Sequence, residues 1–234
     1  MKRLKTAVLW EMRLQFRQGF YYAAAFIAVL MTIVLWQFPK AELPTILPVF
    51  VLGNMTIGTF YFMAGLVLLE KGDGVLEGLI VSPLRQGEYL AAKMISLTLL
   101  TLVENVGIVT AVYGLNANLL LLVLGVGLMA SFNVLCGFIA VARYDSINSF
   151  LMPSILITLT LSVPLVDYLG FWRSPLLYLH PVQAMLLLLK GAFAPIAVWQ
   201  MVYGVLYAAL WIGLLFRISE RIFYRFIVLQ PAQT

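Results

Sequence analysis

The sequence predicts an all-α integral membrane protein that crosses the bilayer six times. Its 234 residues are 63% hydrophobic and only 11% charged, and the mean hydropathy is +1.00. Soluble domains average about 25% charged residues, so this composition is typical of a chain surrounded by lipid. Six apolar stretches each approach the length of about 20 residues that a helix needs to cross a bilayer core. We therefore expect one membrane domain over residues 1–234.

Charge and cysteine content exclude several classes of protein. The formal net charge of +5 does not indicate a nucleic-acid partner, because the cations lie at the ends of apolar stretches, where they set membrane orientation. Cys136 is the single cysteine, so an intramolecular disulfide or a cysteine-based metal site is not expected. The first apolar stretch lacks a signal-cleavage pattern, and we expect it to remain in the protein.

Residues 2–18 have the pattern of a basic amphipathic helix that lies in the membrane interface. A helical wheel places Arg3, Arg13 and Arg17 on one face and mostly apolar side chains on the opposite face. Gln15 breaks this pattern because it falls near the apolar face. The alternative is a flexible basic leader that only fixes orientation.

The spans follow from the apolar stretches and the polar links between them. The second span carries small and hydroxyl residues such as Gly58 and Thr59, which allow helices to approach closely in lipid. Prolines mark the fifth span. The expected spans are residues 20–38, 46–69, 91–113, 119–141, 150–166 and 196–216.

Residues 168–194, between the fifth and sixth spans, hold two apolar pieces that are each too short to cross. Segments of this length are more often interfacial or re-entrant, and the aromatic residues nearby suit the level of the lipid headgroups. We expect two short helices that dip into the outer leaflet. The residues that mark this segment are Trp172, Arg173, Tyr178, His180 and Pro181.

His180 is the only histidine, and no cysteine lies near it in the sequence. A metal site needs several such ligands, so we expect no metal here. We interpret His180 as a residue that breaks a helix at the outer surface.

The distribution of lysine and arginine predicts the orientation. With the amino terminus inside, 12 of these 15 residues fall on the inner side, and only Lys40, Arg173 and Lys190 fall outside. Inner loops of membrane proteins are rich in lysine and arginine. We therefore expect a multi-pass protein of the cell membrane with both termini in the cytoplasm.

The polar stretch at residues 70–90 then lies in the cytoplasm. Its glycines at 72, 74 and 78 do not fit the dinucleotide pattern G-x-G-x-x-G, and the sequence contains no P-loop pattern G-x-x-x-x-G-K-[ST]. We expect no nucleotide site, no other bound cofactor and no catalytic residue in this chain.

These residues fit the start of a short helix better. Asp73 can cap it, and Ser82-Pro83 ends it because proline disfavours helical geometry in the residue before it. The helix would present an apolar ridge shaped for the groove of another protein. The alternative is a helix that packs on the protein's own membrane face.

This stretch resembles the cytoplasmic loop of type-2 ATP-binding-cassette transporter permeases. That family has an acidic–basic run, then Gly-Thr-Leu-Glu, a leucine, Ser/Thr-Pro, and Gly-Lys at the opening of the third span. The sequence departs from the pattern at Val75, where threonine is usual, and at Ala92, where glycine is usual. The matching residues are 70–77 (EKGDGVLE), Leu79, Ser82, Pro83, Glu88 and Lys93.

A later stretch is similar to the family's Asn-Pro-Leu-Thr element and the Arg/Lys-Gly that follows it. It comprises residues 179–184 (LHPVQA) and Lys190-Gly191, with His180 in place of the usual asparagine. The resemblance covers essentially the whole chain in the number and order of spans.

The resemblance implies a permease subunit that exports a drug, a lipid or a glycan and is not itself an enzyme. Two identical or related copies would pair around a central path. Each copy would dock a separate cytoplasmic ATPase, which binds the ATP and Mg²⁺. The docking residues that the resemblance implies are Gly74, Val75, Leu76, Glu77, Leu79, Ile80 and Pro83.

Glu104-Asn105 lies about midway along the third span, where a carboxylate costs about 2.5–3.5 kcal/mol on insertion scales. One interpretation is a substrate or proton site that faces the path between subunits. The alternative is a structural hydrogen bond between helices. The candidate path residues are Asn54, Glu104, Asn105 and Asn133.

Two other classes of protein compete with an exporter. An ion-coupled secondary transporter usually shows several acids within the membrane or an internal repeat, whereas this sequence has one clear acid there and no convincing repeat. An intramembrane enzyme would need a second acid or a histidine beside Glu104, and the neighbouring spans offer neither.

Overall fold

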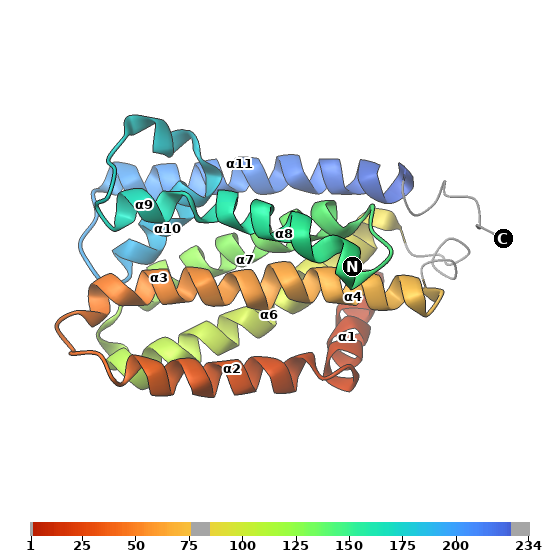
Figure 1. The fold of residues 1–234 in the computed structure, drawn as a ribbon, viewed down its shortest axis with the longest axis horizontal. Helices are drawn as coiled ribbons and strands as arrows, with labels where there is room; N and C mark the ends of the chain where they lie inside the picture. The colour runs from red at the N-terminus through yellow and green to blue at the C-terminus, as the bar shows by residue number, and fades with distance from the viewer. Residues whose placement is uncertain (1, 76–84, 226–234) are drawn as a thin grey trace.

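The bundle is helical throughout the part of the chain that the computed structural model describes, residues 2–75 and 85–225. Long helices run roughly side by side along one axis (Figure 1). Five of them are long and apolar enough to cross a membrane, and a bent pair at the amino terminus raises the number to six. The expected all-α membrane fold is confirmed.

The elements of the bundle follow the expected spans closely. The long helix α7, near the middle of the chain, covers the expected residues 119–141. The elements are α2 (Phe20–Leu35), α3 (Leu43–Met55), η1 (Thr56–Tyr61), α4 (Phe62–Gly72), α6 (Gln86–Tyr113), η2 (Gly114–Asn116), α7 (Leu119–Val141), α8 (Ile147–Ser162), α9 (Pro164–Tyr168) and α11 (Val198–Phe223).

Two helices extend beyond the expected spans into polar sequence. The third span begins at Gln86, before the expected residue 91, because its polar first turn is capped: the carboxylate of Glu88 accepts a hydrogen bond from the backbone N–H of Arg85 at 3.0 Å. The sixth span continues past residue 216 to Phe223, whose ring is buried against Tyr89 and Phe138.

The amino-terminal helix α1 (Lys2–Arg17) lies steeply across one end of the bundle (Figure 1). Gly19, with a φ of +86°, makes the turn into α2, and the two helices meet at 68°. The helix predicted over residues 2–18 is present, but its inner face is partly polar: Gln15 is fully buried, whereas the ring of the next residue, Phe16, is 52% exposed. Its position in the membrane interface stays a prediction.

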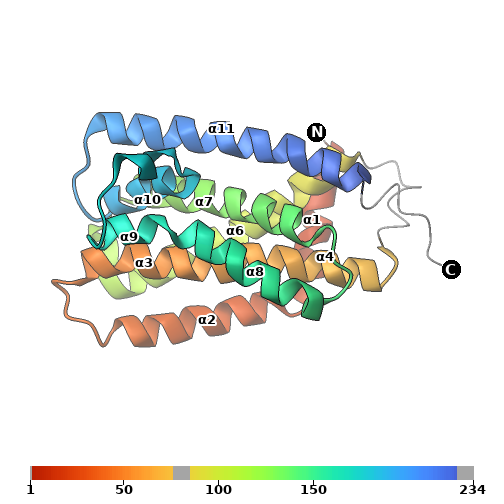
Figure 2. The ribbon, with the colours of Figure 1, turned by 45° about the horizontal axis from the view of Figure 1, so that its top comes forward.

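At the opposite end lie the short helices η3 (Pro175–Leu179) and α10 (Pro181–Gly191). Figure 2 shows α10 between α11 on one side and α3 and α9 on the other, and it contacts all three as well as α7. Glycine allows this close approach: a Cβ built at Gly204 of α11 would lie 3.0 Å from the carbonyl oxygen of Ala184. α10 is therefore part of the core although it is too short to cross a membrane.

Candidate functional site

Three of the four residues predicted for the transport path meet inside the bundle. The side-chain amide of Asn54, on α3, donates hydrogen bonds to Glu104 Oε1 and to Asn105 Oδ1 of α6, each at 3.1 Å. Asn105 in turn donates to the carbonyl oxygen of Thr101 at 2.9 Å. Glu104, Asn54 and Asn105 are 8%, 2% and 0% exposed. We call these three residues the mid-bundle polar cluster.

Asn133 is also buried, on α7, at 3% exposure. It takes no part in the hydrogen bonds that join the mid-bundle polar cluster. Sequence reasoning could place all four side chains in the interior but could not tell which helix faces meet.

The mid-bundle polar cluster has spare acceptors. Among the described residues, Glu104 Oε2 and Asn54 Oδ1 are buried and have no hydrogen-bond partner. A buried acceptor without a donor costs about 1–3 kcal/mol. The arrangement therefore favours an incoming hydrogen-bond donor, such as a water molecule or an ammonium group.

A stretch of π-helix, η1, packs beside this carboxylate and was not predicted. Gly58 lies within it, and a Cβ built there would lie 3.3 Å from Glu104 Oε2. Thr101 Oγ1 donates to the carbonyl oxygen of Gly58 at 3.3 Å. Single π-helical turns frequently occur at functional sites. Glycine at this position gives the carboxylate room against the backbone of the neighbouring span.

A second buried polar group lies near the amino-terminal end of α6, against α1. Lys93 is fully buried, and its ammonium donates to Glu11 Oε2 at 3.0 Å and to Glu70 Oε1. The hydroxyl of Tyr89 donates to Glu70 Oε2. Burial raises the pKa of Glu11, against the opposing effect of the Lys93 ammonium. We call Glu11, Glu70, Tyr89 and Lys93 the buried charge network.

The buried charge network joins α1, α4 and α6. Glu70 and Lys93 were predicted only as parts of a family pattern, and Glu11 and Tyr89 were not predicted. A possible signal was the lysine inside an otherwise apolar helical stretch, since a fully buried lysine requires a partner of opposite charge.

Lys71 anchors the same region to the turn between α7 and α8. Its ammonium donates to the carbonyl oxygens of Ala142 at 2.7 Å and Tyr144 at 2.8 Å, and it pairs with Asp145 at 3.2 Å. The residues that follow Lys71 therefore begin at a position that is held against the turn between α7 and α8. Gly74 then adopts a φ of +67°.

The docking helix stays a prediction. Of its residues, Gly74 and Val75 are described, and Val75 is 45% exposed. The others, Leu76, Glu77, Leu79, Ile80 and Pro83, lie outside the described residues.

In the segment predicted to lie outside, His180 separates η3 from α10, as a helix breaker should, and its side chain is half-buried. Its Nδ1 accepts a hydrogen bond from the backbone N–H of Val182 at 3.3 Å and caps α10. Burial lowers the pKa of His180, which favours the neutral ring that can accept this bond.

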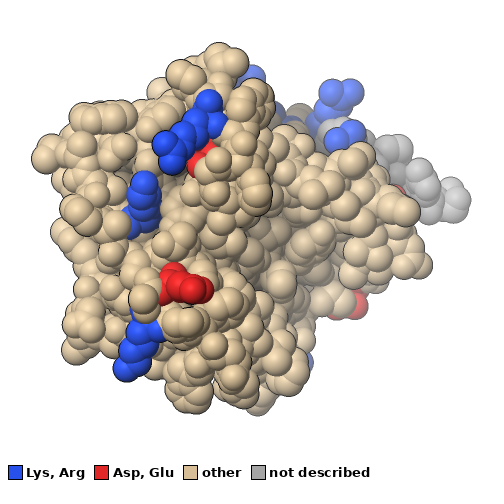
Figure 3. Space-filling model, turned by 60° about the vertical axis from the view of Figure 1, so that its left-hand side comes forward, with Lys and Arg blue, Asp and Glu red and all other residues tan. Residues whose placement is uncertain are grey.

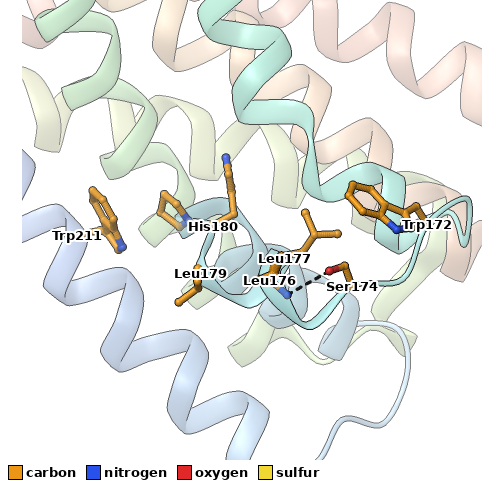
Figure 4. A pocket seen from close by; sticks show the side chains of 8 residues that line it. Trp172, Ser174, Leu176, Leu177, Leu179, His180 and Trp211 are labelled. Carbon is orange, nitrogen blue, oxygen red and sulfur yellow. Dashed lines mark hydrogen bonds between the residues drawn. The ribbon is translucent and has the colours of Figure 1, made fainter.

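The other marked residues of this segment divide into two groups. Trp172, Pro181 and His180 line a hollow of about 370 Å³ together with Trp211 of α11, which sequence reasoning missed (Figure 4). Tyr178 instead stacks on Trp199, with ring centroids 6.0 Å apart. Arg173 is exposed. No group of three or more metal-ligating side chains occurs within the described residues.

Comparison with known proteins agrees with this architecture. The model of the fluoroquinolones export permease protein family matches residues 2–231. Two relatives, the fluoroquinolones export permease proteins of Mycobacterium tuberculosis strains CDC 1551 / Oshkosh and ATCC 25618 / H37Rv, are each 35% identical over 231 residues, which is 97% of this chain and 98% of the relative. The expected permease component of an exporter is confirmed, and such a component is a transporter subunit, not an enzyme. The chain belongs to the fluoroquinolones export permease family.

Proposed function

We propose that this chain is the membrane subunit of an ATP-binding-cassette exporter of the type-2 class, and that it moves fluoroquinolone-like aromatic drugs outward. The observation that carries the proposal is the mid-bundle polar cluster within a chain of this permease family. The cargo class is taken from the names of the two mycobacterial relatives. A cargo with an ammonium group would supply the donor that Glu104 Oε2 and Asn54 Oδ1 lack.

ATP hydrolysis belongs to a separate subunit in this proposal, because the sequence has no P-loop pattern. The ATPase, with its ATP and Mg²⁺, would dock on residues 74–83. Two contacts support this location: Lys71 fixes the chain before the docking residues to the α7–α8 turn, and Lys93 ties Glu70 to α1. Movement of the docking residues would therefore reach α1, α6 and the turn between α7 and α8.

Orientation with both termini in the cytoplasm fits the distribution of charge. Figure 3 shows the end that carries η3 and α10, where basic and acidic side chains are few and isolated. The opposite end carries α1 with Arg3, Arg13 and Arg17 exposed, and the last turns of α11 with further arginines. The positive end is the one that stays inside.

A second permease copy, identical or related, completes the proposed exporter. The span Ile147–Tyr168, which comprises α8 and α9, is only 17% buried along its most apolar part. Met152, Leu156 and Leu159 on α8 are 76%, 69% and 62% exposed. A face of this kind needs either lipid or another copy against it.

The test is transport by the purified permease with its ATPase in lipid vesicles. We expect Glu104→Gln to abolish ATP-driven drug flux and drug-stimulated ATP hydrolysis while membrane insertion stays normal. Glu42→Gln, an exposed carboxylate in the link before α3, is the matched control and should be neutral.

Two results would contradict the proposal. If Glu104→Gln behaves as the wild type, the carboxylate has no role in the path. If the purified complex holds no ATPase and flux follows an ion gradient without ATP, the protein is the competing secondary transporter.

A further inference from the structure

A hollow of about 370 Å³ opens between η3 and α11, in the half of the bundle that we place outside (Figure 4). Its walls are almost entirely apolar, with Trp172 at one end and Trp211 at the other, and Leu176 and Leu179 between them. Ligand pockets for drug-sized molecules usually have volumes of about 300–1,000 Å³ and mostly apolar walls. The hollow is therefore large enough for a small aromatic molecule.

One residue that lines this hollow has a polar atom without a hydrogen-bond partner in the described part of the chain. Trp211 Nε1 is buried and has no hydrogen-bond partner among the described residues. An indole N–H can only donate, so it requires an acceptor. The hydroxyl of the neighbouring Tyr207 donates to the carbonyl oxygen of Leu179 at 2.7 Å, a bond that holds η3 against α11, and it does not accept a hydrogen bond from Trp211 Nε1.

Trp211 lies deeper along its helix than the tryptophans of the membrane interface usually do. It lies 13 residues after Val198, the first residue of a 26-residue helix, which is about 20 Å along the axis at a rise of about 1.5 Å per residue. It is therefore near the middle of a candidate span, within a hydrocarbon core of about 30 Å. Tryptophans that bond to headgroups or water lie at the two interfaces. An acyl chain could fill the hollow, but it carries no acceptor at this depth.

We propose that this hollow binds a flat aromatic ligand that carries a carbonyl or carboxylate oxygen, and that this oxygen accepts the hydrogen bond from Trp211 Nε1. The rings of Trp172 and Trp211 offer faces and edges on which an aromatic ring packs favourably. The inference deepens the proposed function, on which the identity of the cargo rests: the hollow would hold exported cargo in the outer half of the membrane.

The test is equilibrium binding of a radiolabelled fluoroquinolone to the full chain in lipid nanodiscs, without ATPase. We expect Trp211→Phe, which keeps an aromatic ring but removes the N–H, to weaken binding about tenfold, since hydrogen bonds of this kind contribute of that order. Trp199→Phe, on the same helix but outside the hollow, is the matched control and should bind as the wild type does.

A second probe and a second variant separate the hydrogen bond from packing. Naphthalene has a flat ring and no oxygen, so it should bind the wild type and Trp211→Phe equally well. Leu176 is 70% exposed, so Leu176→Trp should fold normally while its larger side chain fills the hollow, and it should abolish binding of the drug.

Three outcomes would overturn the site: no saturable drug binding to the wild type, equal affinities of Trp211→Phe and Trp199→Phe, or normal binding to Leu176→Trp. Vesicle transport distinguishes this failure from failure of the proposed function. If the drug binds as expected but no ATP-driven flux occurs, the exporter mechanism is wrong and the binding site stands. If flux is normal and all three variants bind the drug as the wild type does, only the binding site is wrong.

Discussion

The surroundings of Lys93 show how a charged side chain is stabilised in the interior of this protein. Its ammonium is fully buried, between the carboxylates of Glu11 and Glu70, and Tyr89 donates to the second of these. Taking a charge out of water costs several kcal/mol unless partners of opposite charge and hydrogen bonds compensate. The buried charge network meets this condition with residues from three helices.

Replacing Lys93 should therefore be costly. We expect Lys93→Met to lower the free energy of unfolding by about 3 kcal/mol or more, because it leaves two carboxylates buried without a cation. Thermal unfolding in detergent measures the loss, and Lys40→Met, on an exposed cation, is the control. Adding Glu70→Gln to Lys93→Met should restore part of the stability. Equal melting temperatures for Lys93→Met and the wild type would show that the network contributes nothing.

At the scale of the elements, α7 approaches the π-helical stretch η1 closely only because residue 137 is a glycine without a Cβ. A Cβ built at Gly137 would lie only 2.5 Å from the carbonyl oxygen of Phe60, and neither backbone can move aside freely. Small residues at helix contacts are the usual means of close packing in membranes. The same stretch of η1 carries Gly58, which lies against Glu104.

Gly137→Ala should push these elements apart. We expect a loss of about 1–3 kcal/mol in stability, typical of overpacking, together with reduced drug transport because η1 borders the mid-bundle polar cluster. Gly127→Ala is the control on the same helix, since its nearest neighbour would be a Leu102 methyl carbon at 4.0 Å. Thermal unfolding and vesicle flux measure the two effects. Equal behaviour of the two alanine variants would contradict the close contact.

For the whole molecule, orientation can be tested with single cysteines. Cys136→Ala first removes the only native thiol. In that background we expect Arg173→Cys to react with a membrane-impermeant maleimide in intact cells, and Asp73→Cys to react only after the cells are broken open, because both original side chains are exposed at opposite ends. The reverse pattern of labelling would place both termini outside.

The sequence predicts the spans well because hydrocarbon thickness fixes their length, so that α7 matches the expected residues 119–141. It does not predict contacts between residues far apart in the chain. Glu11, Glu70 and Lys93 meet only after three helices have packed. The π-helical stretch η1 leaves no periodic signal, and Trp211 resembles any other aromatic residue in an apolar span until the position of η3 is known.

The burial of α10 also constrains the order in which the protein can be made. Eight consecutive residues of this helix, from Val182 to Leu189, are buried. The helix is nevertheless too short to remain in a bilayer as a span. It packs closely on α11, which is synthesised after it. Before α11 is made, α10 can already pack on α3, α7 and α9, but the face that contacts α11 is uncovered. Insertion of the last span, α11, then covers this face of α10. A nascent chain that stops before α11 would therefore expose the apolar side chains of α10 to quality-control proteases.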